Sequence, residues 1–227
     1  MQITIKTPAL KEAVACFGKV IRKRMQLAVL EHVRFKAGPE GITAERSDLD
    51  QHVSYAVSTD PAEPADVLIP LASLKTAAKT IGSDGLTIRA NGENATLSWA
   101  GAELNVGTPP VADWPEMPTS KLKQSLSVPA LFFDRLARAV PFASKDGTRR
   151  VLNGVLVEAD GITATDGKKL VHWNMLLDLS APVIVPTDAL VAAGLFGQAA
   201  ELDIAEERLI VRTGPWRYTC KLVDGNY

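Results

Sequence analysis

Apolar and polar residues alternate along many short segments of this chain, and a few longer segments space their apolar residues at helical intervals. Alternation with a period of two predicts strands, whereas spacings of three and four residues mark one apolar face of a helix. Such a face predicts a helix over residues 8–20 and consists of Leu10, Ala13, Val14, Phe17 and Ile21. Pro8 suits the first turn of this helix, and Thr7 is the expected cap.

The same reading predicts one order of elements in each half of the chain. In the first half we expect a strand at 2–6, a helix at 8–20, strands at 30–36, 42–47, 51–57 and 66–70, a helix at 71–81, and strands at 86–90, 95–100 and 102–107. In the second half we expect a strand at 124–128, a helix at 129–140, strands at 152–158, 162–166, 169–176 and 182–186, a helix at 187–196, and strands at 201–205, 208–212 and 216–222.

The two halves also share sequence. LEHV at 30–33 corresponds to LNGV at 152–155, and VLIP at 67–70 corresponds to VIVP at 183–186. A repeat of this length is a whole domain. We therefore predict an α+β fold of two duplicated domains, residues 1–117 and 118–227, each an antiparallel sheet with two helices on one face. The proline-rich segment 109–118 between them is predicted to be a stiff, extended connector.

Charge is balanced overall but uneven along the chain. The sequence holds 25 basic and 26 acidic residues, so bulk charge alone does not predict nucleic-acid binding. Basic residues concentrate on the expected helices and the loops that follow them, whereas acidic residues concentrate on strands and turns; the helix expected at 187–196 breaks this pattern, because it contains Asp188 and no lysine or arginine. The simpler interpretation is solvated helix faces, and the more specific one is a surface that faces phosphates.

Motifs for catalysis are absent from the sequence. The three histidines lack metal-ligand spacing, and no phosphate-binding glycine loop or nucleophile motif occurs. We therefore do not expect an enzyme, a metal site or a cofactor. The two cysteines suit a reducing cytosol, with Cys16 expected in a core, and neither a signal peptide nor a membrane span is predicted. The segment Asp166–Lys169 is predicted to be a hairpin turn.

Four motifs in order carry a family resemblance: LNG at 152–154, ATDGKKL at 164–170, VIVP at 183–186 and KLVDG at 221–225. They resemble the bacterial sliding clamp family, the β subunit of DNA polymerase III, whose pattern reads L-N-G, A-T-D-G-x-R-L, V-I-V-P and K-L-V-D-G-x-[FY]-P. The first half fits this family more loosely, through Arg24, Leu27, Leu30 and VADWP at 111–115. The resemblance covers essentially the whole chain.

The resemblance implies a ring of six domains that encircles double-stranded DNA without reading its sequence, with helices lining the hole. The basic residues then expected to face DNA are Arg22, Lys23, Arg24, Lys75, Lys79, Arg135, Arg138, Lys145, Arg149 and Arg150. The family often has aromatic residues where this chain has Arg150 and Val151.

The resemblance also implies a cleft that binds a short apolar peptide from DNA polymerase and from the clamp loader. The matching positions are Leu152, Thr165, Gly167, Lys168, Lys169 and Leu170. Without the resemblance, Leu152 and Leu170 are equally well explained as packing residues of strands.

The family has three domains per chain and closes its ring as a dimer, whereas this sequence matches two domains. Either a third domain is missing from the sequence, or two-domain chains form a ring of three copies. Two other functions stay open: a clamp-like scaffold that does not encircle DNA, and a regulatory decoy that has lost polymerase binding. The family resemblance also implies a cytoplasmic location and self-association.

Overall fold

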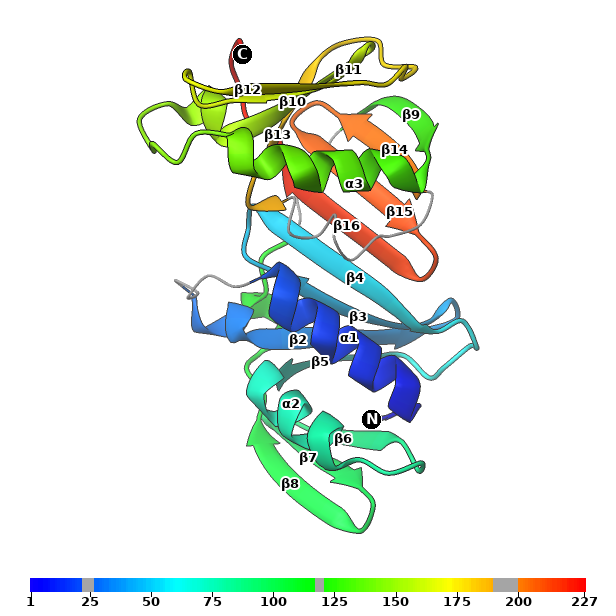
Figure 1. Ribbon diagram of the computed structural model, residues 1–227. Helices are drawn as coiled ribbons and strands as arrows, with labels where there is room; N and C mark the ends of the chain where they lie inside the picture. The colour runs from blue at the N-terminus through cyan, green and yellow to red at the C-terminus, as the bar shows by residue number, and fades with distance from the viewer. Residues whose placement is uncertain (22–26, 117–120, 190–199) are drawn as a thin grey trace. The chain divides into compact units, whose positions relative to one another are not determined.

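The computed structural model describes residues 1–21, 27–116, 121–189 and 200–227, and the chain divides into two compact units, Met1–Met117 and Pro118–Tyr227 (Figure 1). The helix expected at 187–196 lies outside the described residues except for 187–189. Arg22, Lys23 and Arg24 also lie outside them.

Among its described residues, unit 1 has two α-helices that contact each other, α1 (Thr7–Val20) and α2 (Leu71–Thr80) (Figure 1). Helix α1 also contacts β4 (Gln51–Ser58), and α2 contacts β5 (Ala65–Pro70). Its strands form two four-stranded antiparallel sheets, ordered β1-β6-β7-β8 and β5-β2-β3-β4. The elements are β1 (Gln2–Ile5), α1 (Thr7–Val20), β2 (His32–Gly38), β3 (Gly41–Ser47), β4 (Gln51–Ser58), β5 (Ala65–Pro70), α2 (Leu71–Thr80), β6 (Leu86–Asn91), β7 (Asn94–Trp99) and β8 (Ala102–Gly107).

Unit 2 repeats this arrangement, with sheets ordered β9-β14-β15-β16 and β13-β10-β11-β12. Its elements are β9 (Leu122–Val128), α3 (Ala130–Ala139), the 3₁₀ turns η3 (Val140–Phe142) and η4 (Arg150–Asn153), β10 (Gly154–Glu158), β11 (Gly161–Thr165), β12 (Leu170–Asn174), β13 (Val183–Pro186), β14 (Ala200–Ala205), β15 (Arg208–Thr213) and β16 (Trp216–Lys221). The α+β class, the antiparallel strands and the duplication are confirmed. The structure adds that each unit divides its strands between two sheets.

The predicted apolar face of α1 is buried, from Leu10 to Ile21, and Cys16 is a core residue as expected. The cap prediction is wrong. Thr7 is the first helical residue, and its hydroxyl donates a hydrogen bond to the carbonyl oxygen of Gly82 at 2.7 Å. At the other end of α1, the buried Arg46 donates from Nη1 to the carbonyl oxygens of Phe17 (2.6 Å) and Ile21 (2.7 Å). This cation occupies the end where the helix dipole is negative.

The corresponding hairpins of the two units differ in length. In unit 1 the β3–β4 ladder continues to the pair Ser47–His52, whereas in unit 2 the β11–β12 ladder ends at Thr165–Leu170. The turn predicted at Asp166–Lys169 joins these two strands of unit 2 and is confirmed. Leu152 lies in η4 rather than in the strand predicted from that residue, because the chain makes a 3₁₀ turn before β10 begins.

The segment after β8 is not simply extended, as was predicted from its prolines. It contains a 3₁₀ turn, η2 (Val111–Asp113), and then Trp114, which is 4% exposed and packs with the buried Leu30 and Leu68. The repeat places Leu152 and Ile184 at the positions of Leu30 and Leu68 in unit 2.

Candidate partner-peptide and DNA-binding surfaces

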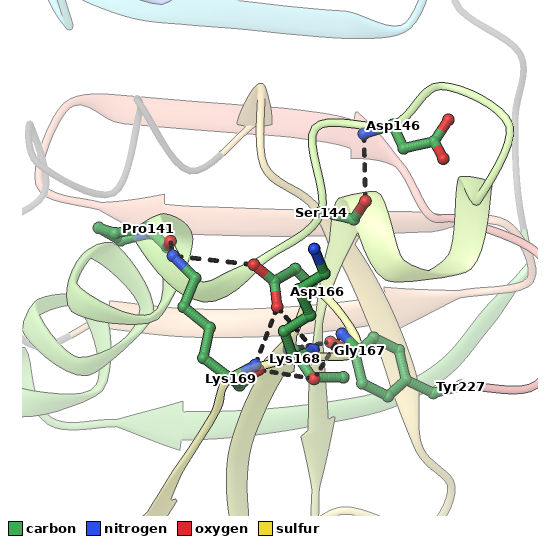
Figure 2. Close-up of polar contacts among 9 residues, drawn as sticks. Pro141, Ser144, Asp146, Asp166, Gly167, Lys168, Lys169 and Tyr227 are labelled. Carbon is green, nitrogen blue, oxygen red and sulfur yellow. Dashed lines mark hydrogen bonds and ion pairs between the residues drawn. The ribbon is translucent and has the colours of Figure 1, made fainter.

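The β11–β12 turn is held by its own polar side chains (Figure 2). Asp166 accepts hydrogen bonds at Oδ1 from the backbone amides of Lys168 and Lys169, both at 2.9 Å. The Thr165 hydroxyl accepts from the amide of Gly167 at 3.0 Å and donates to the carbonyl oxygen of Lys169 at 2.7 Å. Gly167 has a φ of 86°, which a residue with a β-carbon rarely adopts. The turn therefore has a defined shape before any partner binds.

Hydrogen bonds to its carboxylate change the acidity of Asp166. The amides of Lys169 and Lys168, with a smaller contribution from the charge of Lys169, hold the pKa of Asp166 below its ordinary value. The group is therefore charged under all but strongly acidic conditions.

Tyr227 joins this turn to the start of β10. Its hydroxyl accepts a hydrogen bond from the amide of Thr165 at 2.9 Å and donates a longer one to the carbonyl oxygen of Gly154 at 3.4 Å. Burial raises the pKa of this hydroxyl, so it stays protonated at neutral pH. Tyr227 was not predicted as a site residue. The sequence signal for it is that it occupies the [FY] position of the family pattern K-L-V-D-G-x-[FY]-P.

Lys169 extends from the turn toward the end of the first helix of the unit (Figure 2). Its ammonium group donates a hydrogen bond to the carbonyl oxygen of Pro141 at 2.7 Å and lies 3.9 Å from Asp166 Oδ2. It also lies 5.5 Å from the ring centroid of Phe142, within the range of a cation–π contact. Lys169 therefore fixes the turn against η3.

The two predicted leucines of the cleft differ in exposure. Leu170, the first residue of β12, is 62% exposed, so it is not a packing residue within unit 2. Leu152 is half-buried in η4, and its carbonyl oxygen accepts a hydrogen bond from the amide of Ser144 at 2.8 Å. Thr165, Gly167, Lys168 and Lys169 lie between these leucines along the chain and form the turn itself.

The loop before η4 and the first residue of η4 carry three exposed cations that were predicted to face DNA: Lys145, Arg149 and Arg150. Asp146 accepts hydrogen bonds from the hydroxyl and the amide of Thr148. These hydrogen bonds, together with the charge of Arg149, lower the pKa of the Asp146 carboxyl. Arg149 Nε lies 3.8 Å from Asp146. A β-carbon at position 167 would lie 3.1 Å from Arg149 Nη1. The loop and the turn, which were predicted as parts of separate surfaces, are therefore neighbours.

Both paired helices of unit 1 carry exposed basic residues. Lys75 and Lys79 are exposed on α2, and Lys19 is exposed on α1. The Lys75 side chain crosses to the other helix, since a β-carbon on Gly18 would lie 3.4 Å from Lys75 Cε. The Lys75 ammonium group therefore lies close to α1.

The cations of α3 are partly engaged. Arg138 forms an ion pair with Asp134 at 2.8 Å, and Arg135 is half-buried with Nη1 donating to the carbonyl oxygen of Asn174. Both residues still lie on the helix predicted to face DNA, but their charges are less available than those of Lys75 and Lys79.

Within the described ranges, no group of three or more histidine, cysteine, aspartate or glutamate residues could hold a metal ion. Both cysteines are buried, and burial raises the pKa of each thiol to about 12, which makes them poor nucleophiles. None of the helices that the structure describes is long and apolar enough to cross a membrane.

Comparison with known proteins gives one family. The sequence model described as "DNA polymerase III beta subunit, N-terminal domain" matches residues 1–118. The Beta sliding clamp of Pseudomonas aeruginosa is 28% identical over 244 residues, and that of Escherichia coli is 22% identical over 241. Each alignment covers all of this chain and 66% of the relative, so the chain spans slightly less than two thirds of their length.

Solved structures agree on the fold. The DNA polymerase sliding clamp of Bacillus subtilis superposes with a TM-score of 0.90 at 20% identity, covering all of this chain and 66% of that one. The sliding clamp of Pseudomonas aeruginosa bound to griselimycin superposes with a TM-score of 0.87 at 24% identity, with the same coverage.

Proposed function

This chain belongs to the DNA polymerase III β-subunit family, and we propose that it acts as a DNA sliding clamp, a processivity factor that encircles duplex DNA and tethers a polymerase to it. The observation that carries the proposal is that both units, and not only the first, align with Beta sliding clamps. The family is not catalytic, which agrees with the expectation of no enzyme. The replication role also supports a cytoplasmic location.

A clamp needs DNA contacts of a particular kind. Long, exposed cations provide a positive potential that neutralises phosphates without reading bases, while the closed ring supplies the residence time. We assign this role to Lys75 and Lys79 of unit 1 and to the loop cations of unit 2, Lys145, Arg149 and Arg150. Arg135 and Arg138 are weaker contributors, and Arg22, Lys23 and Arg24 are assigned from the sequence alone.

The β11–β12 turn supplies one wall of the proposed partner cleft, which would take apolar peptides from the polymerase and the clamp loader. We assign Leu170 as its exposed apolar contact and the half-buried Leu152 of η4 as its second apolar residue. The internal hydrogen bonds of Thr165, Asp166 and Gly167 support this role, because a preordered wall lowers the entropy cost of binding.

Ring closure is tested by the mass of the particle in solution. Six clamp domains close a ring in this family, so a ring made only of the 227-residue chain takes three copies. Light scattering behind a sizing column then gives a mass near three times 24.3 kDa. A monomer refutes closure by this chain alone.

Retention on DNA tests the encircling function itself. The assembled ring, loaded on nicked circular DNA, is expected to remain bound in high salt and to dissociate after the circle is linearised, because linear DNA lets a ring slide off its ends. Equal retention on circular and linear DNA contradicts encircling and favours the scaffold. Circle-dependent retention without peptide binding favours the decoy.

A further inference from the structure

The β3–β4 hairpin of unit 1 ends in a turn that has the same hydrogen bonds as the β11–β12 turn. The Ser47 hydroxyl accepts from the amide of Leu49 at 3.1 Å and donates to the carbonyl oxygen of Gln51 at 3.0 Å. Asp48 Oδ1 accepts from the amide of Gln51 at 2.7 Å. The same four positions of the β11–β12 turn make the equivalent bonds. The two turns are therefore built alike, although the hairpin of unit 1 is longer.

One position of this turn is strained in unit 1 and not in unit 2. Leu49 has a φ of 81°, where the turn of unit 2 has Gly167 with a φ of 86°. Glycine adopts this left-handed conformation freely, whereas the β-carbon of a leucine crowds the following carbonyl oxygen. The Leu49 side chain is 45% exposed, so burial within unit 1 does not fully offset the strain. The hydrogen bonds of the turn alone therefore do not account for a leucine at this position.

The exposed residue that follows Leu49 is acidic, whereas its counterpart in unit 2 is basic. Asp50 follows Leu49, and Lys168 follows Gly167. Asp50 is exposed, and among the described residues its carboxylate has no hydrogen-bond or ion-pair partner. The two turns thus share a backbone and present opposite charges.

A second exposed carboxylate lies near the same turn. Glu31 ends the 3₁₀ turn η1 (Ala28–Glu31), and the β2–β3 register, in which Arg34 pairs with Glu45, brings the end of β3 beside it. Burial lowers the pKa of Arg46, and the carboxylates of Asp48 and Glu31 partly offset this effect, so both lie within electrostatic range of that side chain. The surroundings of Leu49 are therefore negative on two sides.

An exposed leucine between carboxylates suits a protein ligand of one chemical kind. We propose that Leu49, Asp50 and Glu31 form a second docking surface, the acidic tip, for a partner segment that carries an apolar side chain beside lysine or arginine. Opposite charges around an apolar contact give such a pair its specificity. DNA is excluded as the ligand, because the carboxylates repel phosphates. The acidic tip is separate from the peptide cleft of unit 2, so the proposed function does not depend on it.

NMR titration of the ¹⁵N-labelled chain with three short peptides tests the acidic tip. The peptides share leucine and phenylalanine side chains and differ in two flanking residues, which are both Lys, both Ser or both Glu. The Lys peptide should shift the amide signals of Leu49 and Asp50 and bind there about threefold to tenfold more tightly than the Ser peptide at low salt. Binding in the cleft appears separately, at the amides of Gly167 and Leu170.

Leu49→Gly is the most direct variant, because glycine suits a φ of 81° and removes only the side chain. It should melt at no lower a temperature than the wild-type chain and should lose the Lys peptide at the tip. Leu176→Gly is the matched control, since Leu176 is 93% exposed in another loop and its removal should leave binding at the tip unchanged.

Reversing a charge tests the electrostatic part. Asp50→Lys should make the Glu peptide the preferred one at the tip, and Asp178→Lys, the same change at an exposed position of unit 2, should keep the Lys preference. Equal affinity for the three peptides, absence of shifts at Leu49 and Asp50, or unchanged binding in Leu49→Gly overturns the acidic tip. Self-association of the chain without peptide that is lost in Leu49→Gly would overturn the external partner and assign the surface to a second copy.

Discussion

The ammonium group of Lys169 donates a hydrogen bond to the carbonyl oxygen of Pro141 at 2.7 Å and thereby joins the β11–β12 turn to the end of the first helix of unit 2 (Figure 2). In unit 1 the corresponding helix end is bound by Arg46, which the repeat aligns with Asp166 rather than with Lys169. Each unit places a cation at this negative helix end, but from a different position in its hairpin.

Removing the charge of Lys169 should weaken partner binding more than folding. Lys169→Met keeps an apolar stem but releases the turn from Pro141, so peptide affinity is expected to fall about threefold to tenfold. The free energy of unfolding should change by less than about 1 kcal/mol, because the side chain is half-exposed. Anisotropy and urea denaturation measure the two effects. Lys169→Arg should recover part of the affinity, and unchanged affinity in Lys169→Met would refute the positioning role.

Removing the Tyr227 hydroxyl should loosen the start of the turn. Tyr227→Phe leaves the amide of Thr165 without its acceptor, so this amide should exchange faster with solvent, and stability should fall by about 1 kcal/mol. Hydrogen exchange and urea denaturation are the measurements. Tyr55→Phe removes a hydroxyl bonded to Glu12 in unit 1 and serves as the control, because it should not affect exchange at Thr165.

Arg46 should be the most costly of these side chains to remove. Arg46→Met leaves the carbonyl oxygens of Phe17 and Ile21 without a buried donor, and we expect a loss of about 3 kcal/mol in the free energy of unfolding. The exposed Arg89 provides a control, since Arg89→Met should change stability by no more than about 0.5 kcal/mol. Similar losses in the two variants would contradict the capping role.

The turn should loosen only under acid conditions. Since hydrogen bonds from the Lys169 and Lys168 amides hold the pKa of Asp166 below its ordinary value of 3.8, the carboxylate stabilises the turn fully above that pH. This stabilisation is lost as the pH falls through the lowered pKa. An NMR titration of the Asp166 carboxyl carbon and of the Lys168 amide proton should show one shared, low midpoint. In Asp166→Asn the amide proton should lose this dependence, and its persistence would contradict the assignment.

The two lysines of α2 should contribute to DNA binding through charge alone. Replacing both Lys75 and Lys79 by alanine is expected to reduce the slope of log affinity against log salt by roughly two on duplex DNA of any sequence. Lys6→Ala, an exposed change outside the proposed surface, should leave the slope unchanged. An unchanged slope in the double variant would place DNA elsewhere.

Hydrophobic periodicity located nearly all the described elements, because strands and helices here bury one face against a core. The face from Leu10 to Ile21 needed only that pattern. Periodicity could not predict that each unit divides its strands between two sheets, because strands of both sheets alternate alike. It also could not predict that the Thr7 hydroxyl would donate to Gly82, which depends on a distant loop.

The residues of the candidate site were predicted from sequence motifs, but the contacts that hold the site together were not. Gly167 and Lys169 follow from the turn motif, whereas the approach of Arg149 to Gly167 depends on how the loop after η3 folds back. The bond from Thr165 to Tyr227 joins residues 62 positions apart, and no local pattern encodes it. The sequence also could not distinguish the roles of Lys168 and Lys169, because only the folded structure determines which of two adjacent lysines donates to a carbonyl oxygen.

Trp114 has a consequence for inhibitor design. In unit 1 it packs against Leu30 and Leu68, at the place where unit 2 has Leu152 and Ile184. The unit 1 hairpin is also longer, ending at Ser47–His52. A small molecule shaped to Leu152 and the short β11–β12 turn would therefore find the equivalent place in unit 1 already filled by an indole ring, so its stoichiometry should be one compound per chain.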